Sequence, residues 1–323
     1  MMVLLKVVQV DVRRKGNKAM SDITNKINMA SKRILITGKN SFIGQSFENW
    51  LMQPNYANYY TINTIDTLEE QWKEHDFSQY DIVFHVAGIA HVDNSKLNDS
   101  QRELYYKVNR DLTINVAKKA KSEGVRQFIF MSSSIVFGDS SQPGKKNVIT
   151  KNSIPSPSSI YGDSKLQADI GIHKLQADAF HVVSLRPPMI YGKGCKGNYP
   201  LLSKFIQRIP FFPDIKNERS MLHVDNLCEF IRLIIDNFES GYFYPQNREY
   251  ISTSLLIEEI ARAHGVKVRL TKVFNPFLLV GAKKVKVINK VFGSFVYDKN
   301  LSNYENFKYC VRDFKDSVRQ TEL

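Results

Sequence analysis

Two side chains with complementary acid–base chemistry lie four residues apart in the segment SSIYGDSKLQAD. They are Tyr161 and Lys165, and this spacing places both on one face of a helix. The segment FIFMSSS lies about 30 residues earlier and ends in three hydroxyls, with Ser133 in the middle. A phenol has a reference pKa of about 10, so it acts as a base near neutral pH only beside a cation, which Lys165 would supply. The pattern Y-x-x-x-K is also common on surface helices. The surrounding elements must therefore show whether this pair belongs to an active site.

The segment ILITGKNSFIG predicts a strand, a phosphate-binding turn and a helix. Gly38 and Gly44 stand where such a turn needs glycine, but Ser41 occupies the middle position. A parallel sheet binds dinucleotides outside the carboxyl ends of its strands, where a helix N-terminus offers N–H groups to the pyrophosphate. We expect Ser41 Oγ to lie within hydrogen-bonding reach of the cofactor phosphates or of the turn's own backbone.

Asp66 follows the second predicted strand, 22 residues after Gly44. A carboxylate at this place would bind the ribose hydroxyls of a dinucleotide. The segment DTLEE is also typical of a helix start, with Thr67 and Glu70 as a capping box. Both interpretations stay open at this point.

Short apolar runs alternate with amphipathic segments from Arg33 onward, which predicts an α/β fold with a doubly wound parallel sheet. After Arg186 this alternation of strands and helices ends in the Gly- and Pro-containing segment RPPMIYGKGCKGNYP, which indicates a smaller C-terminal lobe. We expect a nucleotide-binding domain over residues 31–186 and about 222–240. Residues 187–221 and 241–323 would form the second lobe. The predicted strands are RILIT, YYTINTI, DIVFHVAG, RQFIFMS and FHVVSLR, and the predicted helices are FIGQSFENWL and residues 101–123, 159–177 and 224–237.

The net charge of +13 is unevenly distributed. Residues 1–33 carry eight Lys/Arg and two Asp, and residues 1–30 are interpreted as a flexible or non-native extension. A second basic cluster is formed by lysines 283, 284, 286 and 290. Its simple interpretation is a solvated helix face, and the alternative is weak peripheral contact with anionic lipid. No basic motif or stacking platform accompanies these lysines, which disfavours nucleic acid as a partner.

The three cysteines are widely spaced and form no CxxC pair. This usage predicts a reducing compartment, hence a cytoplasmic protein, with no disulfide framework and no metal site. No apolar run approaches the roughly 20 residues that a membrane-spanning helix needs.

Taken in order, these segments resemble the extended short-chain dehydrogenase/reductases of the NAD-dependent nucleotide-sugar epimerase/dehydratase family. The resemblance runs from about Arg33 to at least Asn226 and implies a Rossmann-like sheet with a C-terminal α/β substrate lobe. The segments that carry it are ITGKNSFIG, HDFSQYDIVFHVAG, YYKVNRDLT, FIFMSSSIVFGD, YGDSK, LRPPMIYG and NERSMLHVDNL.

The resemblance also assigns roles by position. Ser133, Tyr161 and Lys165 would be catalytic, with Tyr161 as acid/base and Lys165 as its partner and ribose contact. Substrate would be bound by Ser133, Tyr161, Asn198 and Arg219, with Arg219 on a diphosphate unless it pairs with Glu218 on the surface. The implied cofactor-binding residues are Gly38, Ser41, Phe42, Ile43, Gly44, Asp66, Asp76, Phe77, Val86, Ala87, Gly88, Asn109, Tyr161, Lys165 and Pro188, with Asp76 and Phe77 holding the adenine.

The family implies hydride transfer at C4 of a nucleotide sugar. A 4,6-dehydratase is disfavoured, because no carboxylate follows Ser133 where dehydratases carry an Asp-Glu pair. The segments after Arg186 resemble the branch found in bacterial capsule and O-antigen pathways, so we expect a UDP-hexose or UDP-HexNAc 4-epimerase. A reductase of a UDP-4-keto-6-deoxy-HexNAc and a catalytically silent NAD(P)-binding regulator stay open.

The cofactor and the sugar are less well defined by the sequence. Asp66 favours NAD, because it would repel the 2′-phosphate of NADP. Lys39 in the turn is either a solvent-exposed lysine, which is the simple interpretation, or a contact for that phosphate, so NADP stays open. Met189 replaces an Asn that contacts substrate in many relatives, which leaves the sugar open. The family resemblance implies a homodimer.

Overall fold

The computed structural model describes residues 31–89, 97–282 and 285–323. At its centre lies a six-stranded parallel sheet with the strand order β10-β6-β4-β3-β1-β2. The predicted α/β class and doubly wound parallel sheet are therefore confirmed. The strands are β1 (Lys32–Thr37), β2 (Tyr60–Ile65), β3 (Ile82–His85), β4 (Gln127–Met131), β6 (His181–Leu185) and β10 (Gly241–Phe243).

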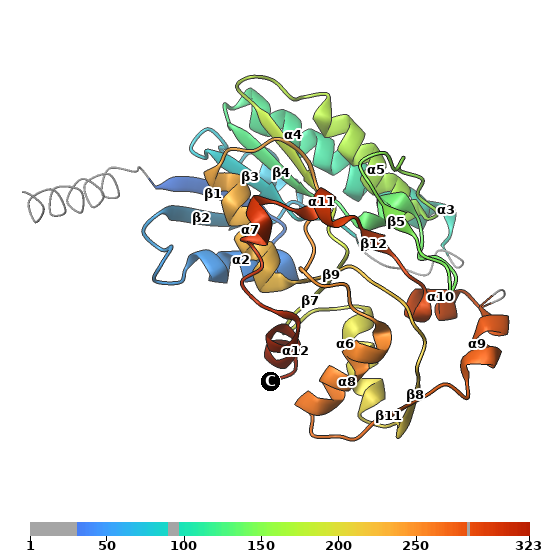
Figure 1. Cartoon of the computed structure of the whole chain (residues 1–323). Helices are drawn as coiled ribbons and strands as arrows, with labels where there is room; N and C mark the ends of the chain where they lie inside the picture. The colour runs from blue at the N-terminus through green and yellow to red at the C-terminus, as the bar shows by residue number, and fades with distance from the viewer. Residues whose placement is uncertain (1–30, 90–96, 283–284) are drawn as a thin grey trace, which may run out of the picture.

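Helices cover both faces of this sheet (Figure 1). Because side chains alternate along a strand, Ile34 and Ile36 of β1 pack on one face and Leu35 on the other. The first face is covered by α2 (Phe42–Leu51) and α7 (Val224–Asp236). The second is covered by α4 (Thr113–Ser122) and α5 (Ile160–His173). Burial on both faces explains why the strands are nearly continuous apolar runs.

The long helix predicted over residues 101–123 forms in three pieces. They are α3 (Asp99–Tyr105), a π-helical segment η3 (Tyr106–Leu112) and α4. Short π-helical insertions of this kind are frequent at functional sites. The local widening of the helix lies at Asn109, one of the predicted site residues.

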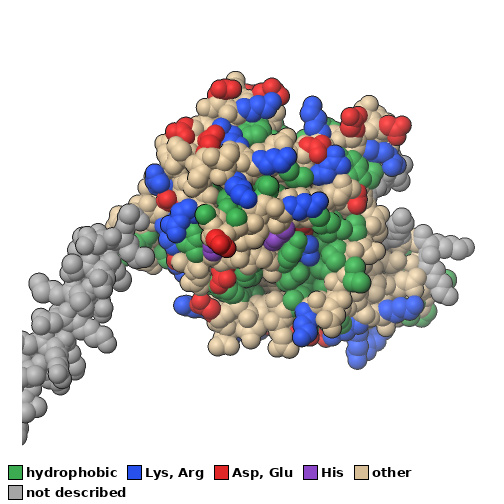
Figure 2. All heavy atoms as spheres, turned by 90° about the horizontal axis from the view of Figure 1, so that it is seen from above, with side chains coloured by type: hydrophobic (Ala, Val, Ile, Leu, Met, Phe, Trp, Pro, Cys, Tyr) green, Lys and Arg blue, Asp and Glu red, His purple; other side chains and the backbone are tan. Residues whose placement is uncertain are grey.

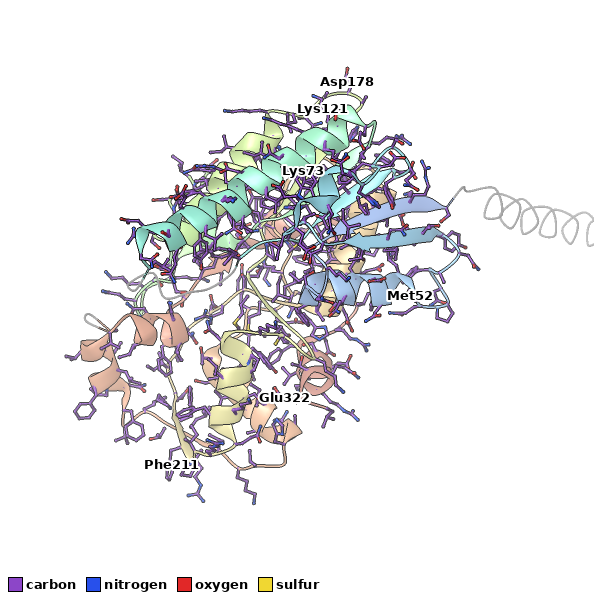
Figure 3. The ribbon with its side chains drawn as sticks, turned by 180° about the vertical axis from the view of Figure 1, so that it is seen from behind. Met52, Lys73, Lys121, Asp178, Phe211 and Glu322 are labelled. Carbon is purple, nitrogen blue, oxygen red and sulfur yellow. The ribbon has the colours of Figure 1, made fainter. Side chains whose placement is uncertain are left out.

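The smaller part of the molecule has its own apolar cluster, which includes Tyr191, Phe212 and Ile257. Phe211 and Glu322 mark this part in Figure 3, whereas Lys121 and Asp178 lie at the opposite end of the molecule. Its strands are β7 (Met189–Tyr191), β8 (Phe211–Pro213), β9 (Met221–His223) and β11 (Arg269–Thr271), and its helices are α6 (Asn198–Ile206), α8 (Thr253–Ala263), α9 (Asn275–Gly281), α10 (Lys286–Phe292) and α12 (Phe314–Glu322). The remaining elements are η1 (Glu70–Lys73), η4 (Ser134–Phe137), β5 (Val148–Ile149), β12 (Val296–Tyr297), α11 (Lys299–Ser302) and η5 (Glu305–Phe307).

The two-lobe division stays a prediction, and the structure differs from it at one boundary. Residues 241–323 were expected in the smaller lobe, but β10 pairs with β6 as the edge strand of the large sheet. Tyr309 is fully buried in the cluster beneath α7. The predicted extension over residues 1–30 and the lysines at 283 and 284 lie outside the described residues.

None of the helices in the described ranges combines the length and apolar character that a membrane span requires. The three cysteines are free.

Candidate active site

The turn between β1 and α2 is built on a close approach of two backbone segments. Gly38 has φ +124°, and a Cβ at this position would lie 2.8 Å from Ala87 N. The amides of Val86 and Ala87 both donate 2.9 Å hydrogen bonds to Thr37 O. Glycine is therefore required at position 38, and the structure brings the turn against Val86 and Ala87.

Ser41 begins helix α2 as its N-cap. Its Oγ accepts a 3.1 Å hydrogen bond from Gly44 N, which confirms the expected contact with the turn's own backbone. Gly44 is also needed here, because a Cβ would lie 2.5 Å from Ser41 Oγ. Phe42 and Ile43 form the first helical turn and pack partly against the core. The N-terminus of α2 thus faces the carboxyl edge of the sheet, where an anion can bind.

Asp66 lies directly after β2, beside this turn. The amides of Gly38 and Lys39 both donate to Ile65 O, and Asp66 is exposed. Its Oδ1 accepts a 2.9 Å hydrogen bond from Leu68 N. The alternative capping box is wrong, because Glu69 caps η1 without a side-chain bond.

Asp76 and Phe77 do not join this group. They precede β3 and therefore lie at the amino edge of the sheet, whereas the turn and Asp66 lie at the carboxyl edge. The Phe77 side chain is fully buried in the core, and its amide donates a 2.6 Å hydrogen bond to Glu123 Oε2. The Asp76 carboxylate accepts from the amide and hydroxyl of Ser78. The predicted adenine contact by these two residues is therefore corrected.

Asn109 is fully buried in the π-helical segment. Its Oδ1 accepts a 2.8 Å hydrogen bond from Ile89 N, and its Nδ2 donates to Ile89 O and to Ser164 Oγ. The side chain therefore holds the Gly88–Ile89 backbone against α5. In this structure Asn109 is a positioning residue for this backbone.

Lys165 is 4% exposed and lies at the carboxyl end of β4. Its Nζ donates a 2.8 Å hydrogen bond to Met131 O and lies 4.5 Å from the centroid of the Phe130 ring. A Cβ on Gly88 would approach this Nζ to 3.1 Å. Burial lowers the pKa of Lys165 to about 8, and the carboxylate of Asp169 acts in the opposite direction.

Tyr161 stands one helical turn before Lys165 on α5, as the four-residue spacing predicts. Burial raises the pKa of Tyr161 to about 12, while a hydrogen bond with Ser133 lowers it and the neighbouring Tyr105 raises it. The rings of Tyr105 and Tyr161 meet edge to face, with centroids 6.5 Å apart. The structure therefore places Ser133 against the Tyr161 phenol, with Lys165 one helical turn further along α5, and leaves the phenol protonated at neutral pH.

Two polar residues that the sequence analysis did not single out support this group. Ser164 Oγ accepts from Asn109 and donates to Tyr161 O. The Asp169 carboxylate is fully buried and accepts from Ser132 Oγ and from Arg186 Nε, both at 2.9 Å. Asp169 lies four residues after Lys165, and this spacing was the available signal.

The other two predicted substrate residues, Asn198 and Arg219, and the predicted cofactor residue Pro188 lie on different segments. Asn198 is exposed at the start of α6, and Pro188 is buried just after β6. The Arg219 guanidinium donates to Lys290 O and, at 3.5 Å, to Gly293 O. Glu218 pairs instead with Lys146, so the surface pair with Arg219 is not formed. Met189 packs against the apolar cluster of the smaller part.

His223 caps α7 and is 2% exposed. Burial lowers its pKa to about 4, so it is a packed, neutral histidine. Among the described residues, no group of three or more His, Cys, Asp or Glu side chains could hold a metal ion.

The parallel sheet, the glycine turn and the Ser-Tyr-Lys group together define a short-chain dehydrogenase/reductase of the extended type. The model of the NAD dependent epimerase/dehydratase family matches residues 34–244, and the chain belongs to this family.

Several characterised proteins are similar to this chain. A UDP-glucose 4-epimerase of Vibrio cholerae is 30% identical over 72% of the chain and 76% of its own length. An Escherichia coli O157:H7 N-acetyl-α-D-glucosaminyl-diphospho-ditrans,octacis-undecaprenol 4-epimerase is 27% identical over 88% of each. Methionine adenosyltransferase 2 subunit beta of Rattus norvegicus is 23% identical over 82% and 81%. The NAD complex of a Bacillus cereus UDP-glucuronic acid 4-epimerase shares the fold, with TM-score 0.66, 18% identity and coverage of 90% and 97%.

Proposed function

We propose that this protein catalyses NAD-dependent redox chemistry at C4 of a UDP-hexose or UDP-HexNAc, as a cytoplasmic 4-epimerase of bacterial surface polysaccharide biosynthesis. The observation that carries the proposal is the hydrogen bond between Ser133 and Tyr161, with the Lys165 ammonium bound to Met131 O beside Gly88. The 30% identical Vibrio cholerae relative supports a UDP-sugar and an epimerase.

The residues around the turn fit a dinucleotide. Gly38 and Gly88 leave room where a Cβ would meet Ala87 or Lys165, and the N-terminus of α2 would hold the pyrophosphate. Lys165 and Asp66 would hold the two ribose groups. Because Asp66 would repel a 2′-phosphate, we propose NAD over NADP. When bound, the nicotinamide accepts or returns the hydride.

Tyr161 would move the proton at the C4 oxygen. Its phenol is protonated at neutral pH in the structure, so it is ready to donate to a carbonyl oxygen. To take a proton from a sugar hydroxyl, the phenol must first lose its own proton. This requires more positive charge near the phenol than the structure alone provides. Lowering of the phenol pKa by Lys165 in the loaded site therefore stays a prediction. Ser133 would steady the sugar oxygen by a hydrogen bond.

Arg219 would bind the diphosphate of the substrate. Its guanidinium donates to two carbonyl oxygens, and within the described ranges no carboxylate forms an ion pair with it, so its charge is available to an anion. The names of both bacterial epimerase relatives describe sugar diphosphates, which supports this role. On the face drawn in Figure 2, basic and acidic side chains are interspersed, which favours a small anionic substrate over a nucleic acid.

The two alternatives use the same fold. A 4-keto reductase would need the same three catalytic residues and would consume one NAD(P)H per turnover. A silent regulator is supported by the similarity to a methionine adenosyltransferase beta subunit. We favour an enzyme, because the Ser-Tyr-Lys group is complete.

Proton NMR of purified protein incubated with NAD and a panel of UDP-sugars tests the proposal. We expect the C4 epimer to accumulate to equilibrium without net change in NAD. Stoichiometric oxidation of NAD(P)H by a UDP-4-keto sugar would identify the reductase. Cofactor binding without turnover of any sugar would identify the regulator.

A further inference from the structure

Helix α9 presents an unusual apolar surface to solvent. Phe277 and Val280 are 77% and 72% exposed, and Val273 just before the helix is 71% exposed. Phe277 and Val280 are three residues apart and therefore lie on the same side of the helix. Together with Phe274 and Val285, these side chains form what we call the α9 patch. Contiguous exposed apolar surface of this kind marks an interaction site.

The inner side of α9 is anchored to the fold. Leu278 packs against the apolar cluster of the smaller part, and Asn275 Nδ2 donates a 2.8 Å hydrogen bond to Asp214 O. Figure 1 shows α9 at the edge of the molecule, beside α10. The exposed apolar residues of the α9 patch are thus held on or beside a helix that is anchored to the rest of the fold.

The chain segment that carries the patch has charge of one sign. Residues 260–297 contain eight Lys or Arg and no Asp or Glu. Of these basic residues, Arg262, Lys267, Arg269, Lys272 and Lys290 are exposed in the described part of the chain. An anionic lipid surface attracts apolar side chains that are flanked by basic ones. The apolar side chains enter the boundary of the acyl chains, and the basic side chains contact the anionic headgroups.

We propose that the α9 patch docks on an anionic phospholipid bilayer. A second copy of the chain fits this surface less well, because a symmetric contact would bring two wholly basic segments together. Docking would also give the protein a defined orientation. Arg219 is bonded to Lys290 O and Gly293 O at the end of α10, so its side of the molecule would face the lipid.

Sedimentation with vesicles tests this proposal. The full chain should sediment with vesicles of phosphatidylcholine and phosphatidylglycerol, and much less with phosphatidylcholine alone. The double substitution F277S/V280S should lower the partitioning by about tenfold. The double substitution L68S/I154S is the matched control, because Leu68 and Ile154 are 69% and 85% exposed elsewhere. It should bind as the unaltered chain does.

The remaining outcomes are equally informative. K267Q/K272Q should weaken binding, and salt at about 0.5 M should reduce it for the unaltered chain. Vesicle binding that F277S/V280S leaves unchanged would overturn the proposal, as would no binding by the unaltered chain. A dimer lost on gel filtration of F277S/V280S, without vesicle binding, would assign the patch to self-association. Since no sugar or cofactor is added, the result is independent of the proposed catalysis.

Discussion

The ammonium of Lys165 donates a 2.8 Å hydrogen bond to the carbonyl oxygen of Met131, the last residue of strand β4. This bond ties helix α5 to the middle of the sheet, two residues before Ser133. The lysine is therefore held by two rigid elements, and its charge is kept at the carboxyl edge where the dinucleotide would bind.

The pH dependence of catalysis should reflect the ionisation of Lys165. Burial lowers the pKa of Lys165 to about 8, so its positive charge is present below this pH and is lost above it. We predict that kcat/KM falls above about pH 8, because this parameter reports groups of the free enzyme. The variant K165R, whose guanidinium stays charged, should retain residual activity without this alkaline limb. An unchanged alkaline limb in K165R would contradict the assignment.

Loss of the Tyr161 hydroxyl should remove proton transfer while leaving the fold intact. We expect Y161F to lower kcat by about 100-fold to 10,000-fold, with NAD affinity changed little. The variant Y304F is the matched control, because its hydroxyl bonds Glu239 outside the site. Activity of Y161F near that of Y304F would exclude Tyr161 as the acid/base.

Two exposed carboxylates at opposite edges of the sheet provide a paired test of cofactor binding. The variant D66N should bind NAD more weakly, because Asp66 lies beside the turn. Its preference for NAD over NADP should also be smaller than that of the unaltered chain. The variant D76N should leave both affinities unchanged, because Asp76 lies at the amino edge. Calorimetric titration with each cofactor measures the difference. Weaker NAD binding by D76N alone would restore the original assignment.

Ser41 should contribute to stability through its capping bond with Gly44 N. We predict that S41A lowers the free energy of unfolding by about 1 kcal/mol, whereas S41G costs only a few tenths. Urea denaturation followed by circular dichroism measures both. Equal losses in the two variants would argue against a capping role.

His85 should make the fold sensitive to acid. It is fully buried on β3 between Thr37 and Thr113, and burial lowers its pKa to about 3 from the ordinary 6.5. Between these values the unfolded chain binds more protons than the folded one, so stability falls as the pH decreases from about 6.5 toward 3. The slope should be on the order of 1 kcal/mol per pH unit. In H85Q this component should vanish from the pH dependence of Tm; an identical slope would refute it.

The large sheet and the shared helix of Tyr161 and Lys165 could be predicted because their signals are local. Strands such as Gln127–Met131 are apolar throughout, and the spacing of Tyr161 and Lys165 fixes their shared helix face. The edge strand Gly241–Phe243 was missed, because three residues carry no periodicity and depend on pairing with β6. The π-helical widening at Asn109 likewise depends on tertiary contacts with Ile89 and Ser164.

The adenine contact was misplaced although the sequence held a usable signal. Phe77 precedes the first residue of β3 by only five positions, whereas a connection from the carboxyl edge back to the amino edge of a parallel sheet usually takes a dozen residues or more. The pKa of Tyr161 could not be predicted either, because the extent of its burial follows from packing around α5.

The fate of a deuterium label at C4 tests the central claim most directly. UDP-glucose, or whichever UDP-sugar the enzyme turns over, would carry deuterium at C4 and be incubated with the protein and NAD. If Tyr161 and its neighbours support hydride removal and return at C4, the epimer should keep the deuterium at C4, and Y161F should form almost none. Loss of the label to solvent, or equal turnover by Y161F, would contradict the account.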